Sequence, residues 1–280
     1  MDQDAVQRAA EAIRGAEALL IGAGAGMGVD SGLPDFRGNQ GFWKAYPPYQ
    51  KLGLDFVSLA NPRWFRDDPS LAWGFYGHRL NLYRRTQPHA GFQILRRWAE
   101  RIKHGAFVFT SNVDGHFQRA GFARDQVMEV HGAINLMQCS RSCGGPFPAD
   151  GLAVFIDEAT MRAQKPLPSC PRCGALARPN ILMFNDWEWD SSETAQQEAR
   201  LNAWLREAGS ASLVVVECGA GMAIPTVRSF CEEVADHPQR KLIRINLRES
   251  EVPDGHTGLT TGALAGLRAI DERLAKTIPQ

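Results

Sequence analysis

The chain has 280 residues, 44% of them hydrophobic, and its 31 basic and 31 acidic side chains leave no formal net charge. This length can bury one large core, and the balanced charge argues against a broad basic face, so we expect no nucleic-acid partner. We expect no membrane span, because no apolar run is long enough and the acidic residues 1–4 are unlike a secretory signal. These features predict a cytoplasmic protein.

The first hundred residues predict a helix, a strand, a glycine-rich turn and a helical insert. Apolar residues at helical spacing predict a helix over residues 3–16, which leads into an apolar strand over 17–22. Glycines follow at every second position, at residues 22, 24, 26 and 28. Such a turn lets backbone N–H groups approach a pyrophosphate closely, because no side chain blocks the way. Residues 39–86, which are rich in aromatics from about residue 54, predict a helical insert.

The rest of the chain predicts further strands separated by helices. A helix over 89–103 leads into the apolar run 106–109, and a short strand over 127–130 ends just before His131. The apolar runs 211–217 and 241–245 predict buried parallel strands, with a helix over 223–236 between them. The predicted fold is α/β, a Rossmann-like doubly wound parallel sheet. Residues just past the strand ends would lie at the edge where such sheets bind ligands.

Four of the six cysteines form two closely spaced pairs. Three residues separate Cys139 from Cys143, two separate Cys170 from Cys173, and 26 lie between the pairs. Four thiolates at these spacings suit a closed, tetrahedral structural zinc site, whereas the alternative is a loop of reduced thiols. The surrounding segment is rich in turn residues, so we expect a small zinc lobe.

Polar residues at regular spacing mark a candidate site. Asn112 and Asp114 occupy alternate positions of an extended segment, so their side chains project to the same side; a polar turn that closes the strand is the alternative. Tyr76 and Arg79 are three residues apart in a predicted helix, which places a phenol and a guanidinium on one face. Together these two groups can bind a carboxylate, although an ordinary helix face would look the same.

These motifs together resemble the signature of the sirtuins, the NAD-dependent protein-lysine deacylases. The similar segments are Gly-Ala-Gly at 24–26, Gly-Leu-Pro-Asp-Phe-Arg-Gly at 32–38, Thr-Ser-Asn-Val-Asp at 110–114, Glu-Val-His-Gly at 129–132, and the four cysteines. Weaker similarity continues through 178–184, 219–222 and 245–246. The resemblance covers roughly residues 17–270, which is nearly the whole chain.

The resemblance implies an activity and a set of site residues. It implies that the chain uses NAD to remove acyl groups from lysines of proteins or peptides, releasing nicotinamide and O-acyl-ADP-ribose, with zinc in a structural role. His131 would be the general base on a ribose hydroxyl, assisted by Asn112 and Asp114. The implied cofactor-binding residues are Gly24, Ala25, Gly26, Asp35, Phe36, Arg37, Asn112, Asp114, Gly219, Gly221 and Asn246.

Three further residues are expected to bind substrate. Tyr76 and Arg79 are similar to the motif with which one sirtuin subgroup binds malonyl and succinyl groups, which predicts acidic acyl-lysine as substrate. Phe184 belongs to a segment similar to the family's peptide-binding strand.

The chain also departs from the family pattern. Gly28 stands where the family has serine, Ser111 where it has glutamine, and His116 where it has leucine, while Ala220 and Gly221 remove two hydroxyls. These changes keep open an ADP-ribosyltransferase or NAD glycohydrolase, or a non-catalytic sensor of NAD or ADP-ribose. A nicotinamide dehydrogenase is disfavoured because the spacing of its glycine fingerprint is absent. No pattern indicates an oligomeric state.

The resemblance and the predicted elements together give a domain organisation. We expect one catalytic domain over residues 1–280, whose Rossmann-like lobe comprises about 1–38, 87–136 and 176–280. The helical insert would span about 39–86, and the zinc lobe about 137–175.

Overall fold

The computed structural model describes residues 1–35 and 38–276, and a six-stranded parallel sheet forms its centre. The strand order is β11-β10-β9-β1-β2-β3, so the chain starts in the middle, builds one side and then returns to build the other. This is the doubly wound order of a Rossmann-like fold, and it confirms the predicted fold class. The strands are β1 Ala18–Ala23, β2 Ala106–Thr110, β3 Val127–Glu129, β9 Leu213–Cys218, β10 Lys241–Asn246 and β11 Thr257–Thr260.

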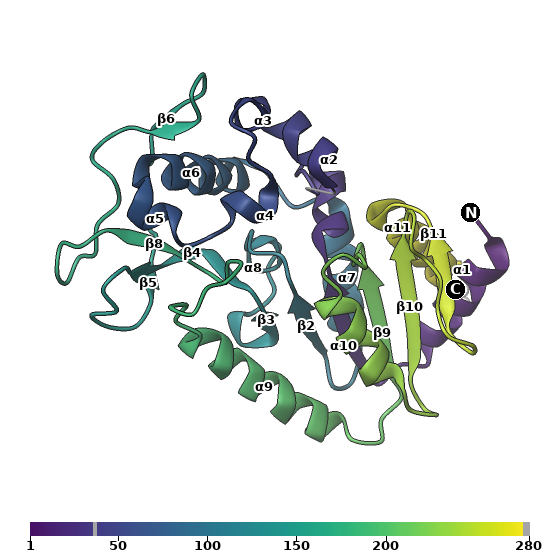
Figure 1. Cartoon of the computed structure of the whole chain (residues 1–280). Coiled ribbons are helices and arrows are strands. Elements are labelled where there is room, and N and C mark those ends of the chain that lie inside the picture. Colours follow the sequence, from purple (N-terminus) through teal and green to yellow (C-terminus); the bar gives the residue numbers. More distant parts are fainter. Residues whose placement is uncertain (36–37, 277–280) are drawn as a thin grey trace.

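Helices cover both faces of this sheet, because its strands are apolar on both sides (Figure 1). Side chains alternate along β1: Leu19 and Ile21 enter one core, and Leu20 enters the other. The first core is closed by α1 (Gln3–Arg14), α7 (Ala90–Ala99) and α11 (Ala263–Ala275). The second core is closed by α9 (Ser192–Ala208) and α10 (Thr226–Ala235).

A second, smaller region lies beside the sheet and contains both the helical insert and the cysteines (Figure 1). The insert consists of α2 Gly38–Ala45, α3 Pro47–Lys51, α4 Phe56–Leu59, α5 Trp64–Asp67 and α6 Pro69–Arg85. Beside it lie an antiparallel sheet of order β5-β4-β8 and the hairpin β6-β7. These strands are β4 Gly132–Cys139, β5 Phe147–Pro148, β6 Ile156–Asp157, β7 Arg162–Ala163 and β8 Ala177–Ile181.

The insert and the strands beside it share one hydrophobic core, although the insert ends at Arg85 and β4 begins only at Gly132. Trp73 of α6 donates from Nε1 to the Ala177 carbonyl at 2.9 Å, which joins the longest helix of the insert to β8. A Cβ atom on Gly74 would lie 1.8 Å from the Met161 carbonyl oxygen, so α6 packs directly on the backbone before β7. We refer to the insert and these strands together as the small domain.

Several boundaries differ from the predicted ones. The helix predicted over 89–103 ends at Ala99, and residues 100–105 turn into β2. Helix α9 was not predicted because its sequence is mostly polar, and strand β11 was not predicted because it is only four residues long. Helix α11 was also not predicted. The remaining short helices are η1 Ala25–Ser31, α8 His116–Arg119 and η2 Arg124–Gln126.

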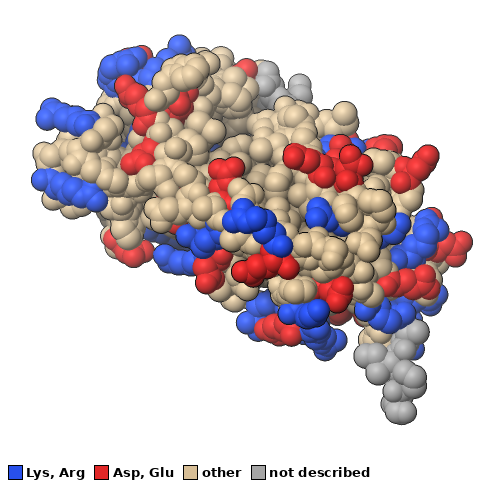
Figure 2. Space-filling view, turned by 90° about the horizontal axis from the view of Figure 1, so that it is seen from below, with Lys and Arg blue, Asp and Glu red and all other residues tan. Residues whose placement is uncertain are grey.

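Surface charge follows the balanced composition. Acidic and basic side chains are interspersed over the face shown in Figure 2, without a broad area of basic residues. Among the described residues, no helix combines the length and apolar character that crossing a membrane requires.

Candidate functional site

The candidate site lies at the carboxyl edge of the parallel sheet. Ala23, the last residue of β1, pairs with Thr110 of β2 on one side and with Cys218 of β9 on the other. Because the strands end at one level, the loops that follow them begin side by side. The chain leaves β1 in one direction toward β2, whereas β9 and β10 are added on the opposite side. The loops after β1 and β9 thus flank the point where the strand order reverses, which is where doubly wound sheets bind ligands.

The glycines of these two loops pack backbone against backbone. A Cβ atom on Gly24 would lie 2.6 Å from the Ala220 Cα, and one on Gly26 would lie 2.7 Å from the Gly219 Cα. The N–H of Gly24 donates to the Cys218 carbonyl, and that of Gly26 donates to the Gly219 carbonyl. These two N–H groups therefore have protein partners, and contact of the glycine loop with a pyrophosphate stays a prediction. Their missing side chains let the two loops approach each other.

Polar side chains after β2 brace the same loop. Thr110 donates from its hydroxyl to the Ala23 carbonyl at 2.9 Å, and Asn112 donates from Nδ2 to the Gly24 carbonyl at 2.9 Å. The carboxylate of Asp114 accepts the backbone N–H of His116 at 2.8 Å and is buried. Asn112 thus contacts the glycine turn, and both side chains have a structural partner. That Asn112 and Asp114 bind NAD stays a prediction.

His131 follows β3 and lies next to the same loops. The N–H of Val130 donates to the Thr110 carbonyl, and the N–H of Leu182 donates to the His131 carbonyl, so neighbours on both sides hold its backbone. Burial lowers the pKa of the imidazole below its ordinary value, and the backbone of Ser111 opposes this shift only in part. The ring is therefore neutral near pH 7 and able to accept a proton.

His116 is a buried polar residue to which sequence reasoning assigned no clear role. Its side chain is fully buried against Phe92, with ring centroids 5.8 Å apart, and neither ring nitrogen has a hydrogen-bond partner among the residues that the structure describes. Burial lowers the pKa of this imidazole, although the Asp114 carboxylate acts in the opposite direction. The sequence signal was the replacement itself, a histidine where the family has leucine.

Asn246 lies at the end of β10 and organises the loops around it. Its Nδ2 donates to the Ala220 carbonyl at 2.7 Å, and its Oδ1 accepts the N–H groups of Arg248 and Glu249 at 3.1 Å. The side chain that we predicted to bind ribose is thus bound to protein on both sides. Whether it also contacts a ribose stays a prediction.

Tyr76 and Arg79 of α6 lie in the core of the small domain near the sheet edge. The Arg79 guanidinium lies over the rings of Phe75, Tyr76 and Tyr83, and its Nε donates to the Tyr83 hydroxyl at 2.9 Å. Burial raises the pKa of Tyr83, and the Asp114 carboxylate adds to this shift, which connects α6 electrostatically to the site. Arg79 is 7% exposed, so its charge faces a largely dry environment.

Phe184 lies in the loop after β8 and contacts the ring of Phe56 edge-on, with centroids 6.1 Å apart. Below this loop, Arg178 forms a bidentate ion pair with Asp186, with N–O distances of 2.7 and 2.9 Å. The N–H of Phe184 also donates to the Ala60 carbonyl, so the loop bridges β8 and the insert. Of the predicted site residues, Phe36 and Arg37 lie outside the described residues.

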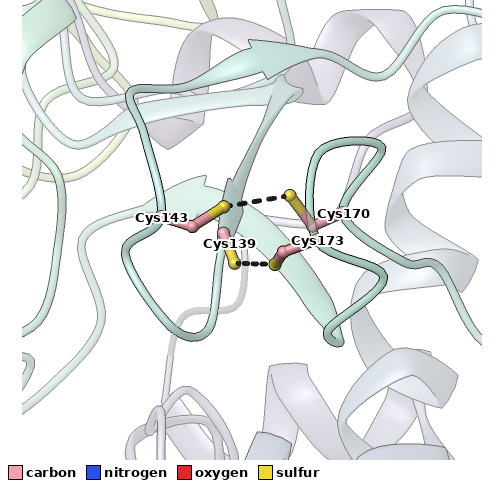
Figure 3. A group of neighbouring side chains, drawn as sticks. All are labelled: Cys139, Cys143, Cys170 and Cys173. Carbon is pink, nitrogen blue, oxygen red and sulfur yellow. Dashed lines mark hydrogen bonds between the residues drawn. The ribbon is translucent and has the colours of Figure 1, made fainter.

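The four cysteines meet at the tip of the small domain, as the spacing predicted (Figure 3). Their sulfur atoms all lie within 4.8 Å of one another, and two pairs are 3.5 Å apart: Cys139 with Cys173, and Cys143 with Cys170. Tetrahedral zinc with four thiolates separates its sulfurs by about 3.8 Å, so the donor set fits zinc. Burial raises the pKa of Cys139, but backbone N–H groups of Cys143 and Arg141 outweigh it and lower this pKa to about 6.

The doubly wound sheet, the glycine loops at its reversal point and the four-thiol lobe define a Rossmann-like protein of the dinucleotide-binding class. The model of the Sir2 family matches residues 24–216. The chain belongs to the Sir2 family, which confirms the resemblance seen in its motifs.

Comparisons with individual proteins agree with this assignment. The chain is 33% identical over 217 residues to "NAD-dependent protein deacylase 1" of Pseudomonas aeruginosa, covering 77% of this chain and 75% of that one. It is 31% identical over 270 residues to a "Probable bifunctional ADP-ribose hydrolase/ADP-ribosyltransferase" of Fusarium oxysporum f. sp. cubense, covering 90% of this chain. The chain spans only 44% of that fungal protein. A crystal structure of a Sir2 homolog–NAD complex superposes with a TM-score of 0.70 at 25% identity, covering 96% of this chain and 93% of that one.

The loop contact predicts that Gly219 tolerates alanine far less than another glycine of similar conformation. Gly219 has φ +63° and a Cβ there would lie 2.4 Å from the Gly26 carbonyl carbon, whereas Gly53 has φ +65° with open space around it. We expect Gly53→Ala to cost about 1–2 kcal/mol through left-handed strain alone. Gly219→Ala adds overpacking and should cost about 3 kcal/mol or more, measured by urea unfolding. Equal losses would show that the loops are not in close contact.

The thiol cluster predicts one structural zinc ion per chain. Removing zinc with a chelator should lower Tm by about 10 °C, because the ion holds two loops of the small domain. Cys139→Ser should abolish metal retention, whereas Cys218→Ala, which changes a buried cysteine of β9, should keep it. Elemental analysis by mass spectrometry and thermal unfolding measure both effects. A Cys139→Ser protein that retains stoichiometric zinc would exclude this site.

The buried imidazole of His116 predicts a loss of stability in acid. Because its pKa is lower when folded than the ordinary value of 6.5, its contribution is complete above about pH 6.5 and is lost as pH falls through the folded-state pKa. His116→Leu should therefore flatten the fall in unfolding free energy between pH 7.5 and pH 5. At pH 7.5 the variant should change stability by less than about 1 kcal/mol, since an unpaired polar group is replaced by an apolar one.

Urea unfolding across this pH range measures the effect, and His237→Asn is the matched control. His237 is exposed, so its replacement should leave the pH dependence as in the unmodified protein. Identical pH dependence in the His116→Leu variant and the unmodified protein would contradict the prediction.

Proposed function

We propose that the chain is an NAD-dependent protein deacylase that acts on acyl-lysine side chains. The observation that carries the proposal is His131, a partly buried and neutral imidazole at the carboxyl edge of the sheet, next to the loop after β2 that carries Asn112 and Asp114. The family match over residues 24–216 and the name of the Pseudomonas relative support the same activity. A cytoplasmic location stays a prediction from composition.

Different residues of the site have different roles in the proposed reaction. The apposed glycine loops leave a backbone surface without side chains, on which the phosphates of NAD would lie. NAD, when bound, would supply a ribose carbon at which the acyl oxygen replaces the departing nicotinamide. Asn112 and Asp114 would orient the amide and ribose ends of the cofactor, and His131 would take a proton from a ribose hydroxyl. Acyl-lysine enters from the small domain, past Phe184.

We further propose that acidic acyl groups, succinyl or malonyl, are preferred. The Arg79 guanidinium is 7% exposed and lies over three aromatic rings, and in such a dry environment its attraction for a carboxylate is strong. Tyr76 lies one helical turn before it, so a phenol and a guanidinium are available together.

Transfer of ADP-ribose to a protein or to water is the second candidate function. The specific observation in its favour is the fungal relative named as an ADP-ribosyltransferase, whose similarity extends over 90% of this chain. Replacement of two hydroxyls by Ala220 and Gly221, and of a glutamine by Ser111, would suit a site with altered substrate contacts. The neutral His131 argues against a third possibility, a sensor without turnover.

The test is release of nicotinamide from NAD by the purified protein. We expect release to require an acyl-lysine peptide and to fall by about 10²-fold to 10⁴-fold in His131→Tyr, since a general base contributes about that much. Release without any peptide would favour the second candidate. Absence of release under every condition would contradict both catalytic proposals.

The same assay tests the acyl preference. Wild-type protein should use a succinyl-lysine peptide better than the acetyl peptide of the same sequence, and Arg79→Met should lose about 10-fold to 100-fold on the succinyl peptide alone, because a charge-assisted pair is removed. Arg85→Met, which changes an exposed arginine at the end of the same helix, is the matched control. Equal turnover of both peptides by the wild type and the Arg79→Met variant would refute the preference.

A further inference from the structure

The loop over residues 182–190, between β8 and α9, is held rigidly by buried partners. Asp186 accepts both terminal nitrogens of Arg178 and also the backbone N–H groups of Met183 and Glu188. The Gln138 side chain then donates to the Glu188 carbonyl at 2.8 Å and accepts the N–H of Asp190 at 3.2 Å. The backbone of this loop is thus fixed on both sides of Trp187.

Trp187 is presented to solvent by this rigid loop. Its side chain is 95% exposed, the highest value among the exposed large hydrophobic residues that the structure describes. Isolated exposed apolar residues are common on proteins, so exposure alone does not indicate a binding site. Here the hydrogen bonds of the loop backbone hold the indole in solvent, so a partner can bind the ring with little loss of conformational entropy.

The loop also begins directly at the candidate catalytic residue. The N–H of Leu182 donates to the His131 carbonyl at 3.0 Å, and Phe184, two residues on, contacts the insert. Trp187 therefore lies five residues along a short, rigid loop from the backbone partner of His131. A polypeptide whose acyl-lysine reaches His131 passes this loop.

The charge beside the indole indicates which side chain it would meet. Glu188 is exposed, and in the described part of the chain its carboxylate has no ion-pair partner, whereas the neighbouring Asp186 is buried against Arg178. Because Glu188 directly follows Trp187, an indole and a carboxylate are exposed on consecutive residues, and a cation is attracted by both kinds of group. A planar guanidinium fits best, because it can stack on the indole while it donates to the carboxylate.

We propose that Trp187 and Glu188 form a subsite for a basic residue, arginine above all, that flanks the acyl-lysine in the protein substrate. This inference rests on the proposed function, which brings the acyl-lysine to His131. The subsite makes substrate choice depend on the sequence around the lysine as well as on the acyl group. Its contribution is to binding, since neither side chain touches the reacting atoms.

The experiment uses acyl-lysine peptides that carry Arg, Ala or Glu at each of the two positions on either side of the lysine. At one of these positions we expect wild-type protein to favour Arg over Glu by about five-fold to ten-fold in kcat/KM, mainly through KM. Trp187→Ala and Glu188→Gln should each reduce this preference to about two-fold or less while leaving turnover of the Ala peptides almost unchanged. Phe155→Ala is the matched control, because Phe155 is 70% exposed and precedes β6, far from the start of α9 (Figure 1).

Peptide binding, measured by fluorescence anisotropy, separates the two proposals. If no peptide is turned over but the Arg peptides bind more tightly in a Trp187-dependent way, the subsite stands and the deacylase proposal fails. Equal affinity for Arg and Glu peptides, or an unchanged preference in Trp187→Ala, overturns the subsite whatever the turnover. A preference for an apolar flanking residue, tested with a Leu peptide, would also overturn it.

Discussion

The loop after β1 and the loop after β9 touch through bare backbone, and the position of the candidate site depends on this contact. Gly24 and Gly26 lie so close to Gly219 and Ala220 that a Cβ atom on either of these two glycines would clash. The N–H of Gly24 donates to the carbonyl at the end of β9, and the N–H of Gly26 donates to a carbonyl in the loop after β9. The contact places Asn112 against Gly24 and Asn246 against Ala220. A larger residue at the interface would separate the loops and displace the side chains that they hold.

Two buried arginine–carboxylate pairs hold loops around the sheet edge. Arg178 pairs with Asp186 under the loop after β8, and Arg244 of β10 pairs with Glu217 of β9 at 2.6 and 2.9 Å and donates to the Glu251 carbonyl. Burial raises the pKa of Glu217, although the Arg244 guanidinium acts in the opposite direction. Buried pairs of this kind add little net stability compared with apolar residues, but they allow few alternative arrangements. Their role here is to position loops, which suits a site assembled from several strands.

The small domain supplies the second wall of the site and is a unit of the tertiary structure. Its core joins aromatic residues of the insert to residues of β4 and β8, and the thiol cluster closes its far end. Arg79 and Tyr76 are both buried within this domain, whereas Trp187, in the loop after β8, is exposed. Acyl group and flanking sequence would thus be recognised by neighbouring parts of one domain.

Much of the architecture followed from the sequence, because its signals are local. Apolar runs predicted strands β1, β2, β9 and β10, and the short strand β3 before His131 was predicted as well. The cysteine spacing predicted the thiol cluster. The glycine turn, with Asn112, Asp114 and His131, marked the sheet edge. Helix α9 and strand β11 escaped prediction, since a polar surface helix and a four-residue strand have weak periodicity. What the sequence could not determine depends on contacts between distant segments. Only the tertiary structure decided that the close approach of Gly219 leaves no room for a side chain on Gly26, and that the insert and the thiol lobe share one core. It also decided that the Asp186 side chain is buried while the Trp187 side chain is exposed.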